Sequence, residues 1–303
     1  MLKETVDRYL DVRRVAGFDM KVDRALLHDF ARLATNRSET HVQRQTAIDW
    51  AATAPSPSQR ECRLGMVRRF ADHARAEDPA HEAVPSKVFV SSPRRRPFPY
   101  IFSPEELVQL LDATADLRPK ASLRPLTYYT LFGLLAATGM RVSEAMHLRI
   151  DDVTNGELII RQTKFRKSRM LPLHETTQAM LTRYLQQRQR AGGGDSHCFI
   201  STKGRALTYA MIHGTFRYLV KRVPLRLKPG QRPRIHNLRH LYAVRALESC
   251  PVGYDRAARH ILALSTYLGH AHVTGTYWYL QTTPHLMMAI ADACELFIQG
   301  EKP

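Results

Sequence analysis

The segment from His236 to His240 places an imidazole and a guanidinium three residues apart, a spacing that puts His236 and Arg239 on one face of a helix. An arginine can neutralise the non-bridging oxygens of a phosphoryl group while a histidine moves a proton, so the pair suits phosphoryl transfer. His236 and His240 also have the i, i+4 spacing of a zinc-binding pair. Position 237 is Asn, however, where a zinc protease with this spacing needs Glu. The pattern therefore favours phosphoryl transfer over metal-dependent hydrolysis.

Two cationic residues upstream could join this chemistry. Arg141 follows Gly139, which should end one helix, and it begins the next helix, where its planar guanidinium can face an oxyanion. Lys164 lies in a basic turn between two expected strands, a place where a lysine is usually solvated. Each signal is weak by itself and gains weight only from the other clusters.

A third group lies downstream, where Gly269 and His270 follow an expected helix and the next helix carries Tyr277 and Tyr279. Aromatic residues here could simply pack. A phenol can also act as a nucleophile when its proton is removed and cations stabilise the developing charge. Two residues correspond to about 200° of helix, so only one of the two tyrosines can face the arginines.

The composition indicates the kind of partner. The chain has 303 residues with 45 Lys and Arg against 28 Asp and Glu, a formal net charge of +17, which favours nucleic acid. No apolar run approaches the roughly 20 residues of a membrane span, and the N-terminus lacks an apolar signal core. The four cysteines, at positions 62, 198, 250 and 294, form no CxxC pair, which excludes a zinc ribbon or a redox motif. We expect a cytoplasmic protein that does not enter a membrane.

The elements that must position these groups fall into three parts. Residues 1–84 predict a small helical domain of four helices, residues 85–101 a basic, proline-rich linker, and residues 102–303 a larger domain that is mainly helical with a small sheet. Thr40 is the expected cap of the third helix, and the sequence from Ser103 to Glu106 predicts a capping box. In the larger domain the expected helices cover residues 126–137, 174–190, 209–222, 236–248, 256–268 and 284–298, and the expected strands cover residues 157–162 and 168–173.

Taken together, the clusters give a specific order: Arg, Lys, His-x-x-Arg, Gly-His, and a Tyr nine residues after that His. The segment TGMRVSE around Arg141 is close to a TGxRxSE box, HNLRH matches an H-x-L-R-H box, and Leu268 to His270 matches an LGH box. The chain thereby resembles the tyrosine recombinases, or phage integrase family, over essentially its whole length. The resemblance implies a helical core-binding domain followed by a mixed α/β catalytic domain. Since the chain starts directly in the helical part, we expect no further arm-binding domain before it.

The resemblance also implies roles for six residues. Tyr279 would attack a scissile DNA phosphate to give a 3′-phosphotyrosine and a free 5′-hydroxyl. Arg141 and Arg239 would hold the non-bridging oxygens and His270 would add a hydrogen bond. His236 would accept a proton, and Lys164, with Lys167 as the alternative, would protonate the leaving oxygen. Glu144 and His240 would support the site. No cofactor or metal is expected, because guanidinium groups would take the role of a metal and the phosphotyrosyl bond conserves the energy of the phosphodiester.

The same reading predicts the partners. Double-stranded DNA would be bound in part by arginines of the linker and of the helical domain, namely Arg94, Arg95, Arg96, Arg44, Arg68 and Arg69. The enzyme would assemble as a homo-oligomer, a tetramer in the synaptic complex, with accessory recombinases as optional partners, and would act at the nucleoid on a mobile element. The apolar stripe of residues 284–298 would either pack within its own chain or dock on a neighbouring protomer. The alternatives are a type IB topoisomerase-like enzyme and a non-catalytic DNA-binding protein of the same fold.

Overall fold

The computed structural model describes residues 2–89, 99–161, 168–192, 194–249, 254–270 and 272–280, together with residues 288 and 295. The chain divides into two compact units, Met1–Arg96 and Pro97–Pro303. The linker arginines Arg94, Arg95 and Arg96 and the turn with Lys164 and Lys167 lie outside the described residues, as does the expected helix over 284–298 apart from residues 288 and 295. Among the described helices, none has both the length and the apolar character that crossing a membrane requires.

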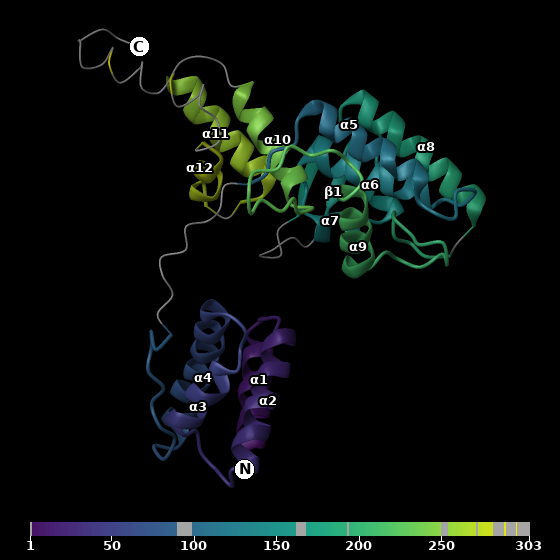
Figure 1. The fold of residues 1–303 in the computed structure, drawn as a ribbon. Coiled ribbons are helices and arrows are strands. Elements are labelled where there is room, and N and C mark those ends of the chain that lie inside the picture. The colour runs from purple at the N-terminus through teal and green to yellow at the C-terminus, as the bar shows by residue number, and fades with distance from the viewer. Residues whose placement is uncertain are drawn as a thin grey trace. The chain divides into compact units, whose positions relative to one another are not determined.

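The first unit contains four helices within its described residues, as predicted: α1 (Leu2–Val15), α2 (Lys21–Asn36), α3 (Arg44–Ala52) and α4 (Pro57–Glu77) (Figure 1). Their apolar faces meet in a core that includes Phe30, Trp50 and Phe70. The predicted cap of α3 was wrong. Thr40 is not the N-cap; its hydroxyl pairs with His41 Nδ1, and the first amide of the helix, that of Arg44, donates instead to a carboxylate oxygen of Glu82 at 2.7 Å.

The second unit is mainly helical. It begins with α5 (Pro104–Asp112), where Ser103 and Glu106 form the predicted capping box. A small antiparallel sheet of β1 (Glu157–Ile160) and β2 (Arg169–Pro172) follows, with Leu158 opposite Leu171. The other elements are η1 (Ala113–Asp116), α6 (Arg124–Thr138), α7 (Val142–His147), η2 (Ile150–Asp152), α8 (Glu175–Ala191), α9 (Tyr209–Val220), α10 (Asn237–Glu248), α11 (Tyr254–Leu268) and α12 (Thr274–Leu280).

Helix α6 lies at the centre of the second unit, in contact with α5, α8 and α10 (Figure 1). It is apolar on most sides, and Leu131, Phe132 and Leu134 are fully buried. Such a helix must be enclosed by other elements. It ends, as predicted, at Gly139, which takes a left-handed φ of 60°. This ending turns the chain sharply toward Arg141 and leaves the Gly139 carbonyl free to accept a hydrogen bond from elsewhere.

Gly139 should be the most sensitive glycine of this region. A Cβ there would lie 2.5 Å from a ring carbon of Tyr242 and 3.0 Å from Leu268, and the left-handed φ adds strain. We expect Gly139→Ala to lower the free energy of unfolding by about 3 kcal/mol, measured by urea denaturation. Gly230→Ala is the control, because Gly230 also has a positive φ, of 77°, and open space around it. The control should cost only about 1 kcal/mol, and equal losses would contradict a steric requirement at Gly139.

Candidate active site

Arg141 is held by groups from two elements. It is the N-cap of α7, and its backbone amide donates to Glu144 Oε2 at 2.8 Å. Its guanidinium donates to Glu144 Oε1 at 2.8 Å through Nη1 and to the Gly269 carbonyl at 2.9 Å through Nη2. An arginine has five N–H donors, and described residues accept from two of those on the guanidinium. The side chain is therefore oriented yet retains donors for an oxyanion.

Arg239 is more deeply buried, with 2% of its surface exposed. It rises from α10 and donates to the carbonyls of Gly139 (2.7 Å) and Leu268 (2.8 Å). These carbonyls lie at the C-terminal ends of α6 and α11, where the helix dipole concentrates negative charge and favours a cation. Burial lowers the pKa of Arg239 to about 10, so the side chain remains charged at neutral pH.

The hydrogen bonds of His270 determine its tautomer. Arg239 Nη2 lies 3.0 Å from His270 Nε2, and a guanidinium can only donate, so Nε2 must carry the lone pair. The proton of the neutral ring is then on Nδ1, which donates to the buried hydroxyl of Thr276 at 2.8 Å. Burial and the charge of Arg239 lower the pKa of His270 to about 4, which keeps the ring neutral.

Tyr279 lies in α12 with 3% of its surface exposed. Its ring centroid is 5.3 Å from that of His240 and 6.2 Å from that of His270, with which it is stacked. Burial raises the pKa of Tyr279, although the charge of Arg239 and a hydrogen bond with it act in the opposite direction. The phenol is thus protonated at neutral pH and has a cation beside its oxygen. The side chain of Tyr277 is outside the description.

His236 and His240 complete the group on α10. Their rings meet edge to face at 4.7 Å, and His240 also contacts Tyr279. Burial, followed by the nearby cations, lowers the pKa of His236 to about 4. Burial and the neighbouring His236 lower that of His240 to about 3. His236 as a whole residue is nevertheless exposed, so an incoming group can reach it and exchange a proton with its ring.

The second unit thus brings together five of the six predicted catalytic residues, Arg141, His236, Arg239, His270 and Tyr279, with Glu144 and His240 beside them, while Lys164 lies outside the described residues. The predicted DNA-binding residues Arg44, Arg68 and Arg69 belong to the first unit. Arg44 and Arg69 are exposed and Arg68 is half-buried. Part of Arg44 is used within the unit, because its Nε donates to the Ala83 carbonyl at 3.1 Å.

Two residues of the site were not predicted from the sequence. Thr276 is fully buried and holds His270. Arg169 binds both carboxylate oxygens of Glu144, at 3.0 and 2.9 Å. A signal for Arg169 was present: in a strand, residues two apart share a face, so Arg169 faces the same side as the buried Leu171. An arginine on a buried face needs an acidic partner.

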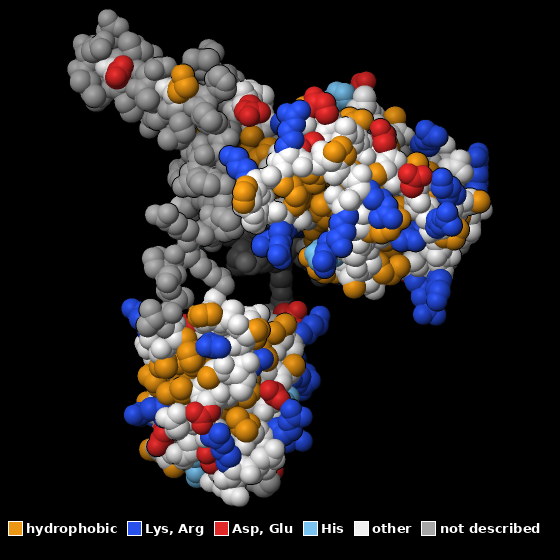
Figure 2. Space-filling model, viewed as in Figure 1, with side chains coloured by type: hydrophobic (Ala, Val, Ile, Leu, Met, Phe, Trp, Pro, Cys, Tyr) orange, Lys and Arg blue, Asp and Glu red, His pale blue; other side chains and the backbone are white. Residues whose placement is uncertain are grey.

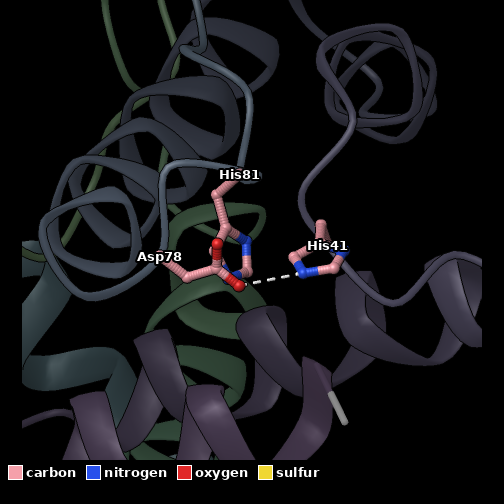
Figure 3. Close-up of side chains that lie close together, drawn as sticks. All are labelled: His41, Asp78 and His81. Carbon is pink, nitrogen blue, oxygen red and sulfur yellow. Dashed lines mark hydrogen bonds and ion pairs between the residues drawn. The ribbon is translucent and has the colours of Figure 1, made fainter.

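One cluster in the first unit has the composition of a metal site. His41, Asp78 and His81 each offer a ligand atom, and these atoms lie within 4.8 Å of one another (Figure 3). The Val42 amide, however, donates to His81 Nδ1 at 3.0 Å, which places the proton of the neutral ring on Nε2. A metal-bound histidine instead offers a lone pair on one nitrogen and donates from the other. We therefore interpret the cluster as a hydrogen-bonded junction, with His41 Nε2 3.0 Å from Asp78, and assign no metal to it.

Comparisons with known proteins agree with this geometry. The model of the phage integrase family matches residues 101–285. "Putative integrase/recombinase y4rB" of Sinorhizobium fredii is 36% identical over 94% of this chain and 94% of its own length. Tyrosine recombinase XerD of Mycobacterium tuberculosis is 28% identical over 75% of this chain and 70% of its own length.

Solved structures match at the level of the fold. The Tn1549 transposon integrase in complex with transposon right end DNA has a TM-score of 0.64 at 17% identity, covering 91% of this chain and 94% of that one. A lambda integrase tetramer bound to a Holliday junction has a TM-score of 0.63 at 17% identity, covering 92% and 76%. These matches confirm the predicted fold class.

The neutral histidines predict a loss of stability in acid. The folded pKa values of His240 and His270, about 3 and about 4, lie below the value of about 6.5 expected in the unfolded chain. The unfolded state therefore binds more protons, and stability is lost as the pH falls from about 6.5 toward 4, by a few kcal/mol in total. Urea denaturation followed by circular dichroism between pH 8 and 4.5 measures this loss. His240→Gln should flatten the dependence and the exposed His272→Gln should not; equal slopes would contradict the assignment.

The assigned tautomer predicts the effect of replacing Thr276. Nitrogen-15 NMR of the histidine rings should show His270 neutral and protonated on Nδ1 at pH 7. Thr276→Val removes the acceptor of that proton and should cost about 1–2 kcal/mol of stability. Thr274→Val, an exposed change in the same helix, should cost less than about 0.5 kcal/mol. A ring protonated on Nε2 would overturn the assignment.

Proposed function

Because the chain belongs to the phage integrase family of DNA strand-transferring enzymes, we propose that it cuts and rejoins DNA through a covalent bond between Tyr279 and a 3′-phosphate. The observation that carries the proposal is the buried position of the Tyr279 phenol, with Arg239 at its oxygen and the rings of His240 and His270 around it. The site lies within one unit of a single chain, so the nucleophile acts in cis.

The proposed reaction uses the N–H donors of the arginines that are not engaged within the protein. The Tyr279 oxygen attacks the scissile phosphorus, the bond from phosphorus to the 5′ oxygen breaks, and the phenolic proton goes to a base. Arg141 and Arg239 hold the non-bridging oxygens, where their charge stabilises the pentacoordinate transition state. The phosphodiester energy is retained in the phosphotyrosyl bond, so a free 5′-hydroxyl can later attack it and rejoin the strand.

Proton transfer falls to neutral histidines and to the basic turn. With a pKa of about 4, His236 is unprotonated at neutral pH and can accept the phenolic proton. His240 contacts both the His236 ring and the Tyr279 ring and supports this transfer. We assign protonation of the leaving 5′ oxygen to Lys164, with Lys167 of the same turn as the alternative.

Double-stranded DNA is the proposed substrate, and the net charge of +17 supports it. Lys and Arg side chains lie on the face of the second unit that Figure 2 shows, and Arg183 and Arg190 of α8 and Arg217 of α9 are exposed. We assign further backbone contacts to Arg44, Arg68 and Arg69 and to the linker arginines Arg94, Arg95 and Arg96. Acting on DNA, the enzyme would work at the nucleoid.

A mobile element is the proposed source of the DNA, because the structural match to the transposon integrase covers 91% of this chain and 94% of that one. Assembly into a tetramer, with accessory recombinases where they exist, is supported by the lambda integrase tetramer bound to a Holliday junction. In that assembly residues 284–298 would dock on a neighbouring protomer.

The test is a covalent trap. Wild type and Tyr279→Phe are incubated in EDTA with nicked duplexes that tile the DNA flanking the gene, and SDS-resistant adducts are mapped by peptide sequencing. We expect an adduct at Tyr279 in wild type and a loss of more than about 10⁴-fold in the variant, because no other group supplies the nucleophile. Tyr129→Phe, a change at a partly exposed tyrosine of α6, should retain activity.

The alternative outcomes are informative. An adduct at Tyr277 would keep the reaction and contradict the assigned nucleophile. Tight DNA binding without an adduct on any duplex would contradict the proposed cleavage and favour a binding protein. Cleavage and religation of one strand without exchange between two duplexes would favour a topoisomerase-like enzyme.

A further inference from the structure

Arg169 is the most extensively bonded side chain next to the proposed site that has no assigned role. It is the first residue of β2, with 14% of its side chain exposed. It donates to both oxygens of Glu144 and, through Nε, to the Tyr267 carbonyl at 2.9 Å. It also packs against Gly269, where a Cβ would come within 2.8 Å of Nη1. One guanidinium therefore ties β2 to α7 and to the end of α11.

The contacts of Glu144 show why a second arginine is needed. Its carboxylate has 5% of its side-chain surface exposed and accepts from Arg141 and Arg169 together. Burial by itself would raise the pKa of Glu144, but the bonds from Arg169 and Arg141 outweigh it and keep the pKa below its usual value. Glu144 is therefore a buried anion shared by two cations.

The pairing of Glu144 with two arginines determines the net charge beside a bound phosphate. Arg141, Glu144 and Arg169 together carry +1. Without Arg169 the sum would be zero, and Glu144 would pair with Arg141 alone in a low-dielectric setting, where the pairing is strong. A carboxylate can accept two parallel N–H bonds from one guanidinium, so it would draw Arg141 into a bidentate pair and occupy the donors that should face the substrate.

We propose that Arg169 is a positioning residue that occupies Glu144 and thereby leaves the charge and the donors of Arg141 available to the scissile phosphate. The inference rests on the proposed function, since it assigns Arg141 to the phosphate. The proposal also explains the need for glycine at position 269. The Gly269 carbonyl accepts a hydrogen bond from Arg141, and the absence of a Cβ at this position leaves room for the Arg169 guanidinium.

The test asks whether removing the negative charge of Glu144 restores activity that is lost with the positive charge of Arg169. A purely structural role of Arg169 does not predict such a rescue. The variants are Arg169→Met, Arg169→Lys, Glu144→Gln and the double variant Glu144→Gln/Arg169→Met. The rate of Tyr279 adduct formation is measured at saturating DNA, below the melting temperature of every variant, and the DNA dissociation constant is measured separately.

We expect Arg169→Met to slow adduct formation by about 100-fold and Arg169→Lys by about tenfold, because lysine keeps the charge but not the two parallel bonds. The dissociation constant should change less than about threefold, since many phosphate contacts supply the affinity. The double variant restores the +1 charge around Arg141. It should react about tenfold faster than Arg169→Met, although it also lacks the carboxylate of Glu144.

Arg161→Met is the control, because Arg161 also pairs with a buried carboxylate, that of Asp152 in η2, and is not a partner in the described hydrogen bonds of the Arg141 guanidinium. It should lower stability without slowing the reaction. A double variant as slow as Arg169→Met, or Arg169→Met at the wild-type rate, would overturn the proposal. Absence of an adduct in wild type would instead overturn the proposed function.

Discussion

The site depends on helix ends that hold cations. Arg239 donates to the last carbonyls of α6 and α11, and Arg141 donates to the carbonyl that follows α11. Both helices end in a glycine with a left-handed φ, Gly139 and Gly269, and this ending leaves carbonyls that no residue of the same helix satisfies. The two arginines fill that deficit. Both guanidinium groups are thereby fixed mainly by backbone, and Glu144 is the carboxylate shared by Arg141 and Arg169.

This arrangement determines the state of every titratable group around it. Burial disfavours protonation of His236, His240 and His270, and the positive charges nearby add to this effect, so the three rings are neutral. The Tyr279 phenol experiences opposing effects, because burial favours its protonated form and Arg239 favours the phenolate. The phenol proposed as the nucleophile is therefore protonated at rest, while the cation that would stabilise its charge is already in contact with it.

Local signals in the sequence predicted the elements well, and long-range contacts account for the failures. Gly139 and the capping box of Ser103 act within a few residues, and the structure confirms both. Thr40 failed as a cap because Glu82, distant in the sequence, satisfies the first amide of α3. Periodicity alone could place Arg169 on a buried face but could not identify Glu144 as its partner. No signal in the sequence identifies Thr276 as part of the site either, because only the folded chain brings its hydroxyl to His270.

The bond between Arg239 and His270 constrains how a phosphate can enter. That bond uses a donor of Arg239 and the lone pair of His270 Nε2. A phosphate oxygen only accepts, so it can take the Arg239 donor but gains nothing from a bare Nε2. For His270 to contribute a hydrogen bond, its ring must bind a second proton. The phosphate charge would favour this protonation, against the burial and the nearby cations that now lower the pKa of His270. Thr276 can accept from Nδ1 in either state, so the ring need not reorient. In the proposed reaction, substrate entry and protonation of His270 would thus be parts of one exchange.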